Sequence, residues 1–222
     1  MDHLVSATPG QWTVRRAPPT AGDAMSWPGP ADVTAEWRPL GQPWRAAPEP
    51  TFNPGWARLR WRPSGLDVTT VFIGRNQTNR ASRLNDRTWE LGDIAELFVQ
   101  AADRPRYAEL HVTPENRRLQ LLWPADGLAD FRAGRKPFAD FTVDDPAWVT
   151  SEVRVRPDHW TVRLHLPFSC LGLDAATPPT GLRACVCRYD WSHGTEVLSS
   201  TAPLGAPDYH RVAEWQPLRL VE

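Results

Sequence analysis

The feature that most constrains this chain is an alternation of apolar and polar residues with a period of two. Residues 56–62 read Trp-Ala-Arg-Leu-Arg-Trp-Arg, so that apolar side chains and arginines fall on opposite sides of the segment. This alternation is typical of a strand with one buried and one solvated face. The turn residues 63–65, Pro-Ser-Gly, separate it from the apolar run 66–73, and together they predict a hairpin.

Similar short segments recur along the rest of the chain and predict further strands. They are 93–100, 107–112, 118–123, 149–155, 160–166, 182–189 and 218–221. A 3.6-residue apolar stripe is absent from every segment longer than about ten residues, although 124–140 favours a short helical turn. We therefore predict an all-β fold, a jelly-roll-like β-sandwich of roughly eight to ten antiparallel strands.

Proline and tryptophan are concentrated near the N-terminus. The chain contains 23 Pro and 12 Trp, and ten of the prolines fall within residues 1–54, which excludes long helices there. We predict an N-terminal arm at 1–30 that precedes a single domain at 31–222. Trp12, Trp27, Trp37 and Trp44 carry too much apolar surface for a solvated tail, so we expect some of them to dock on the domain.

The balance of charge limits the classes of partner. The 26 acidic and 25 basic residues give a net charge of −1, so no broad attraction to nucleic acid or to an anionic membrane is expected. The sequence has no apolar run long enough to cross a bilayer and no recognisable signal peptide. The three cysteines Cys170, Cys185 and Cys187 cannot form a disulfide framework, so we expect a cytoplasmic, reducing location.

Four segments occur in an order that resembles a known family. They are Trp89-Glu-Leu-Gly-Asp-Ile-Ala-Glu-Leu-Phe98, Tyr107-Ala-Glu-Leu-His-Val-Thr-Pro114, Trp160-Thr-Val-Arg-Leu-His-Leu-Pro-Phe168 and Gly181-Leu-Arg-Ala-Cys-Val-Cys-Arg188. The set resembles the family 9-like carbohydrate-binding modules, which are related in fold to DOMON domains, over about residues 56–220. This resemblance implies a non-catalytic β-sandwich that binds a saccharide.

The resemblance also implies the residues of a sugar site. In sugar-binding members two tryptophans clamp the sugar ring, and Trp89 and Glu96 look like counterparts of one clamp residue and one polar partner. The second clamp position falls near Ser200, and Trp191 is the expected substitute. Arg163, Leu182 and Cys185 depart from the family pattern. The predicted ligand-binding residues are Trp89, Asp93, Glu96, Tyr107, Glu109, Arg188 and Trp191.

The residues themselves leave two interpretations of this set open. Glu96 lies in an apolar strand and needs a partner if it is buried, for which Arg188 is the natural candidate. This pair is either structural or part of a ligand site. Trp89 is either a sugar platform or a cover at one end of the core, and we expect Glu109 and His111 to lie on a solvated face.

The sequence gives little support to metal or catalytic chemistry. Asp144 with Asp145, or Asp126 with Asp130, are possible calcium ligands, but neither pair resembles an EF-hand loop. The bound metal is therefore left open, with calcium unassigned and no other cofactor expected. The only methionines are Met1 and Met25, which disfavours a Met/His haem site.

Catalysis is also disfavoured, because no motif of a hydrolase, nucleotide-binding protein or zinc protease is present. Glu96 and Glu109 on neighbouring strands could reach the separation found in glycosidases, but adjacent strands often place carboxylates that close. The alternative to sugar binding is a protein-interaction domain or homo-oligomer on an inherited fold, since Trp and Arg are enriched at interface hot spots. An open concavity lined by Trp89, Glu96 and Arg188 would favour the sugar.

Overall fold

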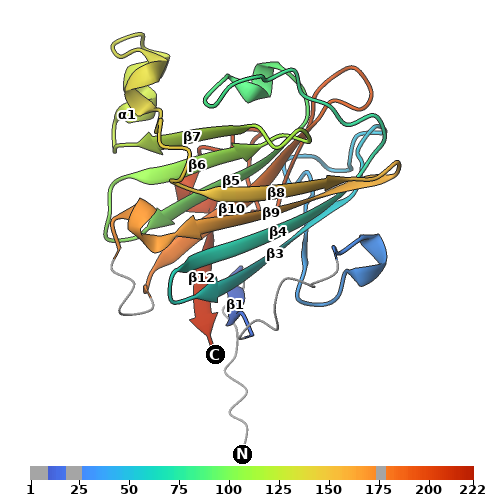
Figure 1. Cartoon of the computed structure of the whole chain (residues 1–222), viewed down its shortest axis with the longest axis horizontal. Coiled ribbons are helices and arrows are strands. Elements are labelled where there is room, and N and C mark those ends of the chain that lie inside the picture. The colour runs from blue at the N-terminus through green and yellow to red at the C-terminus, as the bar shows by residue number, and fades with distance from the viewer. Residues whose placement is uncertain (1–9, 19–26, 174–178) are drawn as a thin grey trace, which may run out of the picture.

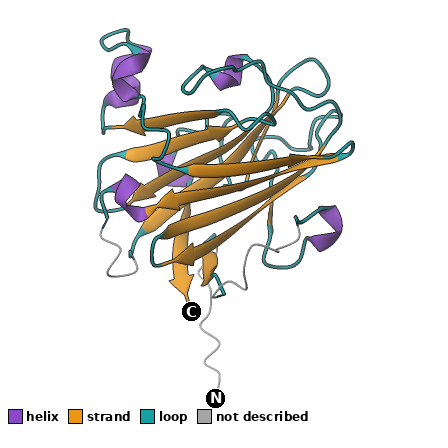
Figure 2. Ribbon diagram, in the orientation of Figure 1, coloured by secondary structure: helices purple, strands orange, loops and turns teal. Residues whose placement is uncertain are grey.

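Twelve strands dominate the computed structural model, which describes residues 10–18, 27–173 and 179–222. The strands are β1 Trp12–Arg16, β2 Arg38–Pro39, β3 Gly55–Arg62, β4 Gly65–Ile73, β5 Ile94–Ala101, β6 Tyr107–Val112, β7 Arg118–Trp123, β8 Thr150–Val155, β9 His159–Pro167, β10 Leu182–Asp190, β11 Val197–Ser200 and β12 Gln216–Val221. The predicted all-β fold is confirmed (Figure 2).

The strands form one mixed sheet that folds over on itself into two layers. Its order is β7-β6-β5-β10-β12-β1-β3-β4-β9-β8, with β11 paired to β10 and β2 paired to β3. We call the layer of β7, β6, β5, β10 and β11 the β5 sheet, and the layer of β1, β2, β3, β4, β9 and β8 the β4 sheet. Strand β12 pairs with β10 on one side and with β1 on the other, so it joins the two layers (Figure 1).

Helices in the described residues are few and short. The α-helix α1 is Gly127–Arg132, and in Figure 1 it stands beyond the end of β7. The 3-10 helices are η1 Pro30–Asp32, η2 Thr88–Glu90, η3 Phe138–Phe141, η4 Phe168–Leu171 and η5 Val212–Glu214. The short helical turn expected within 124–140 is confirmed by α1. Of these helices, none has the length and apolar character that crossing a bilayer would require.

Apolar side chains at every second position of the strands fill the interior of the sandwich. On β5, Ala95, Leu97 and Val99 face the β4 sheet and pack in a cluster with residues such as Val162 and Leu164 of β9. The intervening residues of β5 point away from the β4 sheet, yet they are buried as well. Their face is covered by a second apolar cluster, which we call the outer cluster. The elements α1 and η3 and the segment 202–215 contribute to it.

The predicted strands are observed within a few residues of their expected ends, but three strands were not predicted. Strands β2 and β11 are only two and four residues long, too short for a period-two pattern to stand out. The expectation of purely antiparallel strands is wrong at β1, which runs parallel to both β12 and β3.

Strand β1 also changes the interpretation of the predicted arm. Trp12 is fully buried and belongs to the interior cluster, so this part of the arm is a strand of the sheet. Trp37 is buried, with Arg58 above its ring. Trp44 packs against the outer cluster, where its ring centroid lies 6.5 Å from that of Tyr209. The expected docking of these tryptophans is therefore observed.

Candidate functional site

Three polar side chains lie together on the outer face of the β5 sheet. Glu96 of β5 is directly opposite His111 of β6. Glu109 precedes His111 by two residues on β6, so its side chain lies on the same face. The exposed fractions are 4% for Glu96, 4% for Glu109 and 1% for His111. We call these three residues the polar triad. The expectation that Glu109 and His111 lie on a solvated face is wrong, because the outer cluster covers that face.

Hydrogen bonds hold the polar triad in one arrangement. His111 Nε2 lies 2.7 Å from Glu96 Oε1 and 2.9 Å from Glu109 Oε1, so one imidazole nitrogen contacts both carboxylates. His111 Nδ1 lies 2.8 Å from Thr88 Oγ1, and Trp123 Nε1 donates a hydrogen bond of 2.6 Å to Glu109 Oε2. Among the described residues, the buried Oε2 atom of Glu96 has no hydrogen-bond partner.

Burial and mutual attraction set the protonation of the triad. Burial raises the pKa of Glu96 to about 7, because desolvation outweighs the attraction of His111. Burial alone would lower the pKa of His111, but the two carboxylates outweigh it and raise the pKa to about 9. Burial also opposes ionisation of Glu109, yet hydrogen bonding to His111 and the charge of His210 leave its pKa below the usual value. Near neutral pH the triad therefore contains an imidazolium between carboxyl groups.

Aromatic rings surround the polar triad. Trp89 of η2 is half-buried, and its ring centroid lies 5.9 Å from that of His111 and 5.5 Å from that of Phe138. The ring of Trp123 stacks on Phe141 at 4.5 Å. Tyr107 Oη lies 2.8 Å from His210 Nδ1, and Tyr107 belongs to the same outer cluster. Four predicted site residues, Trp89, Glu96, Tyr107 and Glu109, are thus brought to one face.

Asp93, Arg188 and Trp191 form a separate group at the end of β10. Asp93 is buried; its Oδ1 accepts a hydrogen bond from the backbone nitrogen of Trp191, and its Oδ2 accepts one from that of Thr78, both at 3.0 Å. Burial raises the pKa of Asp93. These bonds connect the loop before β5 to the loop after β10, which is a structural role for the carboxylate.

Arg188 lies on the opposite face of the β5 sheet from Glu96. It pairs in register with Ala95, whose side chain points into the sandwich, and its guanidinium carbon lies 5.1 Å from the ring centroid of Phe72. It forms a fully buried ion pair with Asp190 at 3.0 Å. The expected Glu96–Arg188 pair is therefore wrong, because successive residues of a strand face opposite sides. Trp89, Glu96 and Arg188 do not line one concavity.

Several neighbours of the triad were not predicted as site residues. Thr88 and Trp123 were missed because their contacts depend on how loops and strands meet in space. Tyr189 of β10 is half-buried near Glu96: burial raises its pKa, and the charge of Glu96 raises it further. Tyr189 could have been found from the sequence, because it lies two residues after Cys187 and so shares a face of β10 with it. Cys187 is directly opposite Glu96. Ser200, at the expected second clamp position, is buried against Cys185.

The acidic pairs considered for calcium lie in other parts of the fold. Asp130 of α1 is paired with Arg135 at 2.8 Å and with Lys136 at 3.4 Å. Asp144 Oδ1 accepts a hydrogen bond from Asn85 Nδ2, and Asp145 Oδ1 accepts one from a backbone nitrogen. Calcium binding at these residues, and at Asp126, stays a prediction.

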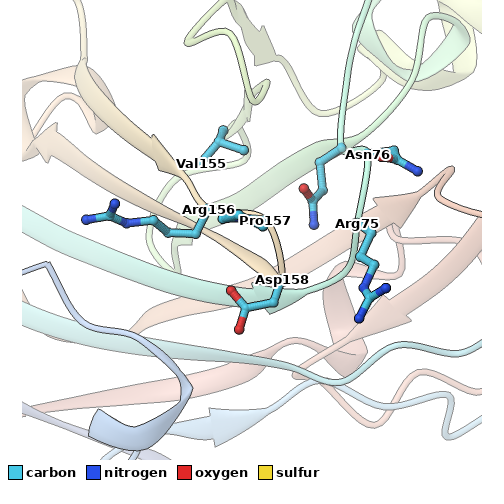
Figure 3. Close-up of a pocket in the computed structure, with 7 residues that line it drawn as sticks. Arg75, Asn76, Val155, Arg156, Pro157 and Asp158 are labelled. Atoms are coloured by element: carbon cyan, nitrogen blue, oxygen red, sulfur yellow. The ribbon is translucent and has the colours of Figure 1, made fainter.

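A surface hollow of about 600 Å³ lies at another edge of the molecule, between the loop after β4 and the turn joining β8 to β9. The seven described residues that line it include no aromatic ring; they are Arg75, Asn76, Gln77, Val155, Arg156, Pro157 and Asp158. Figure 3 shows the guanidinium groups of Arg75 and Arg156 pointing in different directions. This hollow contains none of the predicted ligand-binding residues and lacks a platform for a sugar ring.

Comparisons with known proteins bear on the fold. No protein-family model matches the sequence, and no curated protein matches it. A structure from Bacteroides uniformis, assigned provisionally to carbohydrate binding, has a TM-score of 0.67 at 17% identity, over 84% of this chain and 86% of that one.

Two further similar structures are of a family 9 carbohydrate-binding module from Caldicellulosiruptor kristjanssonii. The complex with cellotriose has a TM-score of 0.59 at 14% identity and covers 95% of this chain and 93% of that one. The complex with glucose has a TM-score of 0.56 at 14% identity and covers 94% of each chain. The chain therefore has the fold of the family 9 carbohydrate-binding modules.

Proposed function

We propose that this chain is a non-catalytic carbohydrate-binding domain whose saccharide packs on Trp89 and hydrogen-bonds to the polar triad. The observation that carries the proposal is the contact between the half-buried indole of Trp89 and the imidazole of His111, which in turn contacts the buried carboxylates of Glu96 and Glu109. A sugar offers apolar C–H faces and a rim of hydroxyl groups. An aromatic plate beside fixed carboxylate and imidazole groups matches both features.

The similar structures support this proposal by their ligands as well as their fold. Those of the Caldicellulosiruptor kristjanssonii module hold cellotriose and glucose. Glucose and short β-glucans are therefore the first saccharides to test. The arrangement of the triad also supports a binding role over hydrolysis, because Glu96 and Glu109 share one nitrogen of His111, so neither carboxylate stands apart as a separate acid or nucleophile.

Burial of the triad determines how the saccharide would enter. Phe138 of η3 contacts the indole of Trp89, and Phe131 of α1 contacts Phe138 with ring centroids 5.7 Å apart. Rotation of the half-buried Trp89 and Phe138 side chains would open a path to His111 without moving a strand. Part of the binding energy is spent on this opening, so we expect dissociation constants between about 1 mM and 1 μM, or roughly −4 to −8 kcal/mol.

Calorimetric titration of the whole chain tests the proposal. Glucose, cellobiose, cellotriose and a panel of other saccharides should include at least one that releases or absorbs heat with a 1:1 stoichiometry. Trp89→Ala should abolish this binding. Trp27→Ala is the matched control, because Trp27 is also half-buried but stacks on Arg163 of β9, in the β4 sheet. Binding unaffected by Trp89→Ala would contradict the proposed site.

A second candidate is a protein-interaction domain on the same fold. It is favoured by the cover over the outer face of the β5 sheet, where the chain's own aromatic residues occupy the space above the triad. A wild-type protein that binds no saccharide of the panel, together with a stable homo-oligomer in light scattering, would support this alternative over sugar binding.

A further inference from the structure

We propose that the polar triad is a binding site for one divalent transition-metal ion, with Zn²⁺ as the best fit. The donors are one carboxylate oxygen each from Glu96 and Glu109 and the Nε2 atom of His111. This inference goes beyond the proposed sugar binding and does not depend on it. Among the described residues, these three form the one cluster of His, Cys, Asp or Glu side chains that brings three possible donor atoms within 4.8 Å of one another.

The positions of the three donors suit a compact metal shell. Glu109 and His111 are two residues apart on one strand, and Glu96 is directly opposite His111 on the next strand, so all three share a face. Metal–ligand bonds of about 2.0–2.1 Å place the donors of a tetrahedral shell about 3.3 Å apart. His111 Nε2 now lies 2.7 Å and 2.9 Å from the carboxylate oxygens. The donors need to separate by only about half an ångström, which side-chain torsions can supply.

Contacts behind the donors already orient two of them for a metal. Thr88 Oγ1 lies 2.8 Å from His111 Nδ1, so it can accept a hydrogen bond from the Nδ1 proton. The metal ion then replaces the proton on Nε2, which is released to solvent. Trp123 Nε1 donates to Glu109 Oε2, which leaves Oε1 as the donor atom on the triad side. Partners of this kind fix the tautomer and the direction of ligands in metal sites.

The unpartnered oxygen of Glu96 is an independent indication of a missing ligand. Its Oε2 atom is buried and has no hydrogen-bond partner in the part of the chain that the structure describes, while its Oε1 atom contacts His111, so the carboxylate points into the triad. An unsatisfied carboxylate oxygen in an apolar setting is costly. A divalent cation bound to two carboxylates and a neutral imidazole makes the group neutral overall. Imidazole and carboxylate together suit zinc among the common metal ions.

The inference is tested with metal ions alone, on the whole chain, without saccharide. Protein freed of metal by a chelator should bind one Zn²⁺ per chain in calorimetry, and Co²⁺ should produce a visible absorption band of a low-coordinate site. Glu96→Gln and His111→Gln should weaken Zn²⁺ binding at least about tenfold, the lower end of the loss seen when a residue that only orients a ligand is removed.

A matched control is available in the β4 sheet. His165 Nδ1 lies 2.8 Å from Asp67 Oδ1, which is a half-buried histidine–carboxylate pair with a single carboxylate. His165→Gln should leave Zn²⁺ binding unchanged. Trp89→Ala should also keep the 1:1 stoichiometry, so loss of sugar binding and loss of metal binding are distinguishable.

Two outcomes would overturn the inference. The first is a wild-type protein that takes up no stoichiometric Zn²⁺ or Co²⁺. The second is metal binding that is the same in wild type and in the two triad variants. Should a buried variant fail to fold, X-ray absorption at the zinc edge of the wild-type complex decides, because a spectrum without imidazole scattering excludes His111 as a ligand.

Discussion

Both faces of the β5 sheet contain buried charged groups, but these groups are paired differently on the two faces. On the inner face, the guanidinium of Arg188 lies above Phe72, donates a hydrogen bond to the carbonyl of Ile73 and pairs with Asp190. On the outer face, the Oε2 atom of Glu96 has no hydrogen-bond partner within residues 10–18, 27–173 and 179–222. Among the described residues, Nε and Nη2 of Arg188 also lack a hydrogen-bond partner, so incomplete hydrogen bonding does not separate the two faces. What differs is the pairing: Arg188 forms an ion pair with Asp190, whereas Glu96 and Glu109 share one nitrogen of His111, so that three donor atoms lie close together on the outer face.

The largest effect is expected from removing the inner-face cation. Arg188→Met would leave the buried Asp190 without its ion-pair partner and the Ile73 carbonyl without a donor. We expect a loss of about 3–5 kcal/mol in the free energy of unfolding, measured by urea denaturation. Arg183→Met is the control, because Arg183 is a half-exposed residue of the same strand and should change stability by less than about 0.5 kcal/mol. Equal effects of the two substitutions would show that the buried pair of Arg188 with Asp190 does not stabilise the fold.

An intermediate effect on the free energy of unfolding is expected when His111 loses the hydroxyl group that contacts its Nδ1 atom. Thr88→Val keeps the shape of a fully buried side chain but removes the oxygen that contacts His111 Nδ1. In chelator-treated protein this should cost about 1–3 kcal/mol, because a buried imidazole nitrogen loses its partner.

Thr70→Val makes the same chemical change as Thr88→Val but is expected to change the free energy of unfolding in the opposite direction. The Oγ1 atom of Thr70 is buried without a hydrogen-bond partner among the described residues. Replacing it with a methyl group should therefore be neutral or stabilising in the same urea titration. A destabilisation as large as that of Thr88→Val would show that side-chain shape, not the hydrogen bond, is what matters at Thr88.

The smallest effect is expected at the edge of the outer-face cover. Arg132 of α1 pairs with Asp208 of the segment 202–215 at 3.3 Å, and both side chains are well exposed. Because solvent screens such pairs, Arg132→Ala should change the free energy of unfolding by less than about 1 kcal/mol. Phe131→Ala should cost more, since the Phe131 ring packs against Trp123 inside the cover. The reverse order in urea denaturation would mean that ion pairing holds the cover in place.

Most of the fold follows from patterns that are local in the sequence. The alternation in residues 56–62 predicted β3, and the segments 107–112 and 118–123 predicted β6 and β7 with their observed ends. Strand β1 escaped prediction because its few residues lie among prolines. Its place in the sheet depends on β12 and β3, which are distant in the sequence.

The candidate site was predicted only in part, and the reason is geometric. The period of two places Glu96 on one face of β5, but the face assigned to Arg188 depends on the register between β5 and β10. That register aligns Cys187, not Arg188, with Glu96. The burial of Glu109 and His111 depends on α1, η3 and the segment 202–215 folding over the sheet, and no pattern within β6 reports this cover.

The position of β1 has a consequence for the order in which the protein assembles during synthesis. Trp12 pairs in register with Leu218, and Arg16 donates a hydrogen bond to Glu222. A ribosome makes β1 long before β12, so β1 has to wait for its parallel neighbour on one side until β12 has been synthesised. Such a distant pairing is entropically slow to form. The pairing of β1 with β12, which joins the two layers, is therefore expected to form late in folding. A nascent chain would expose the indole of Trp12 until then.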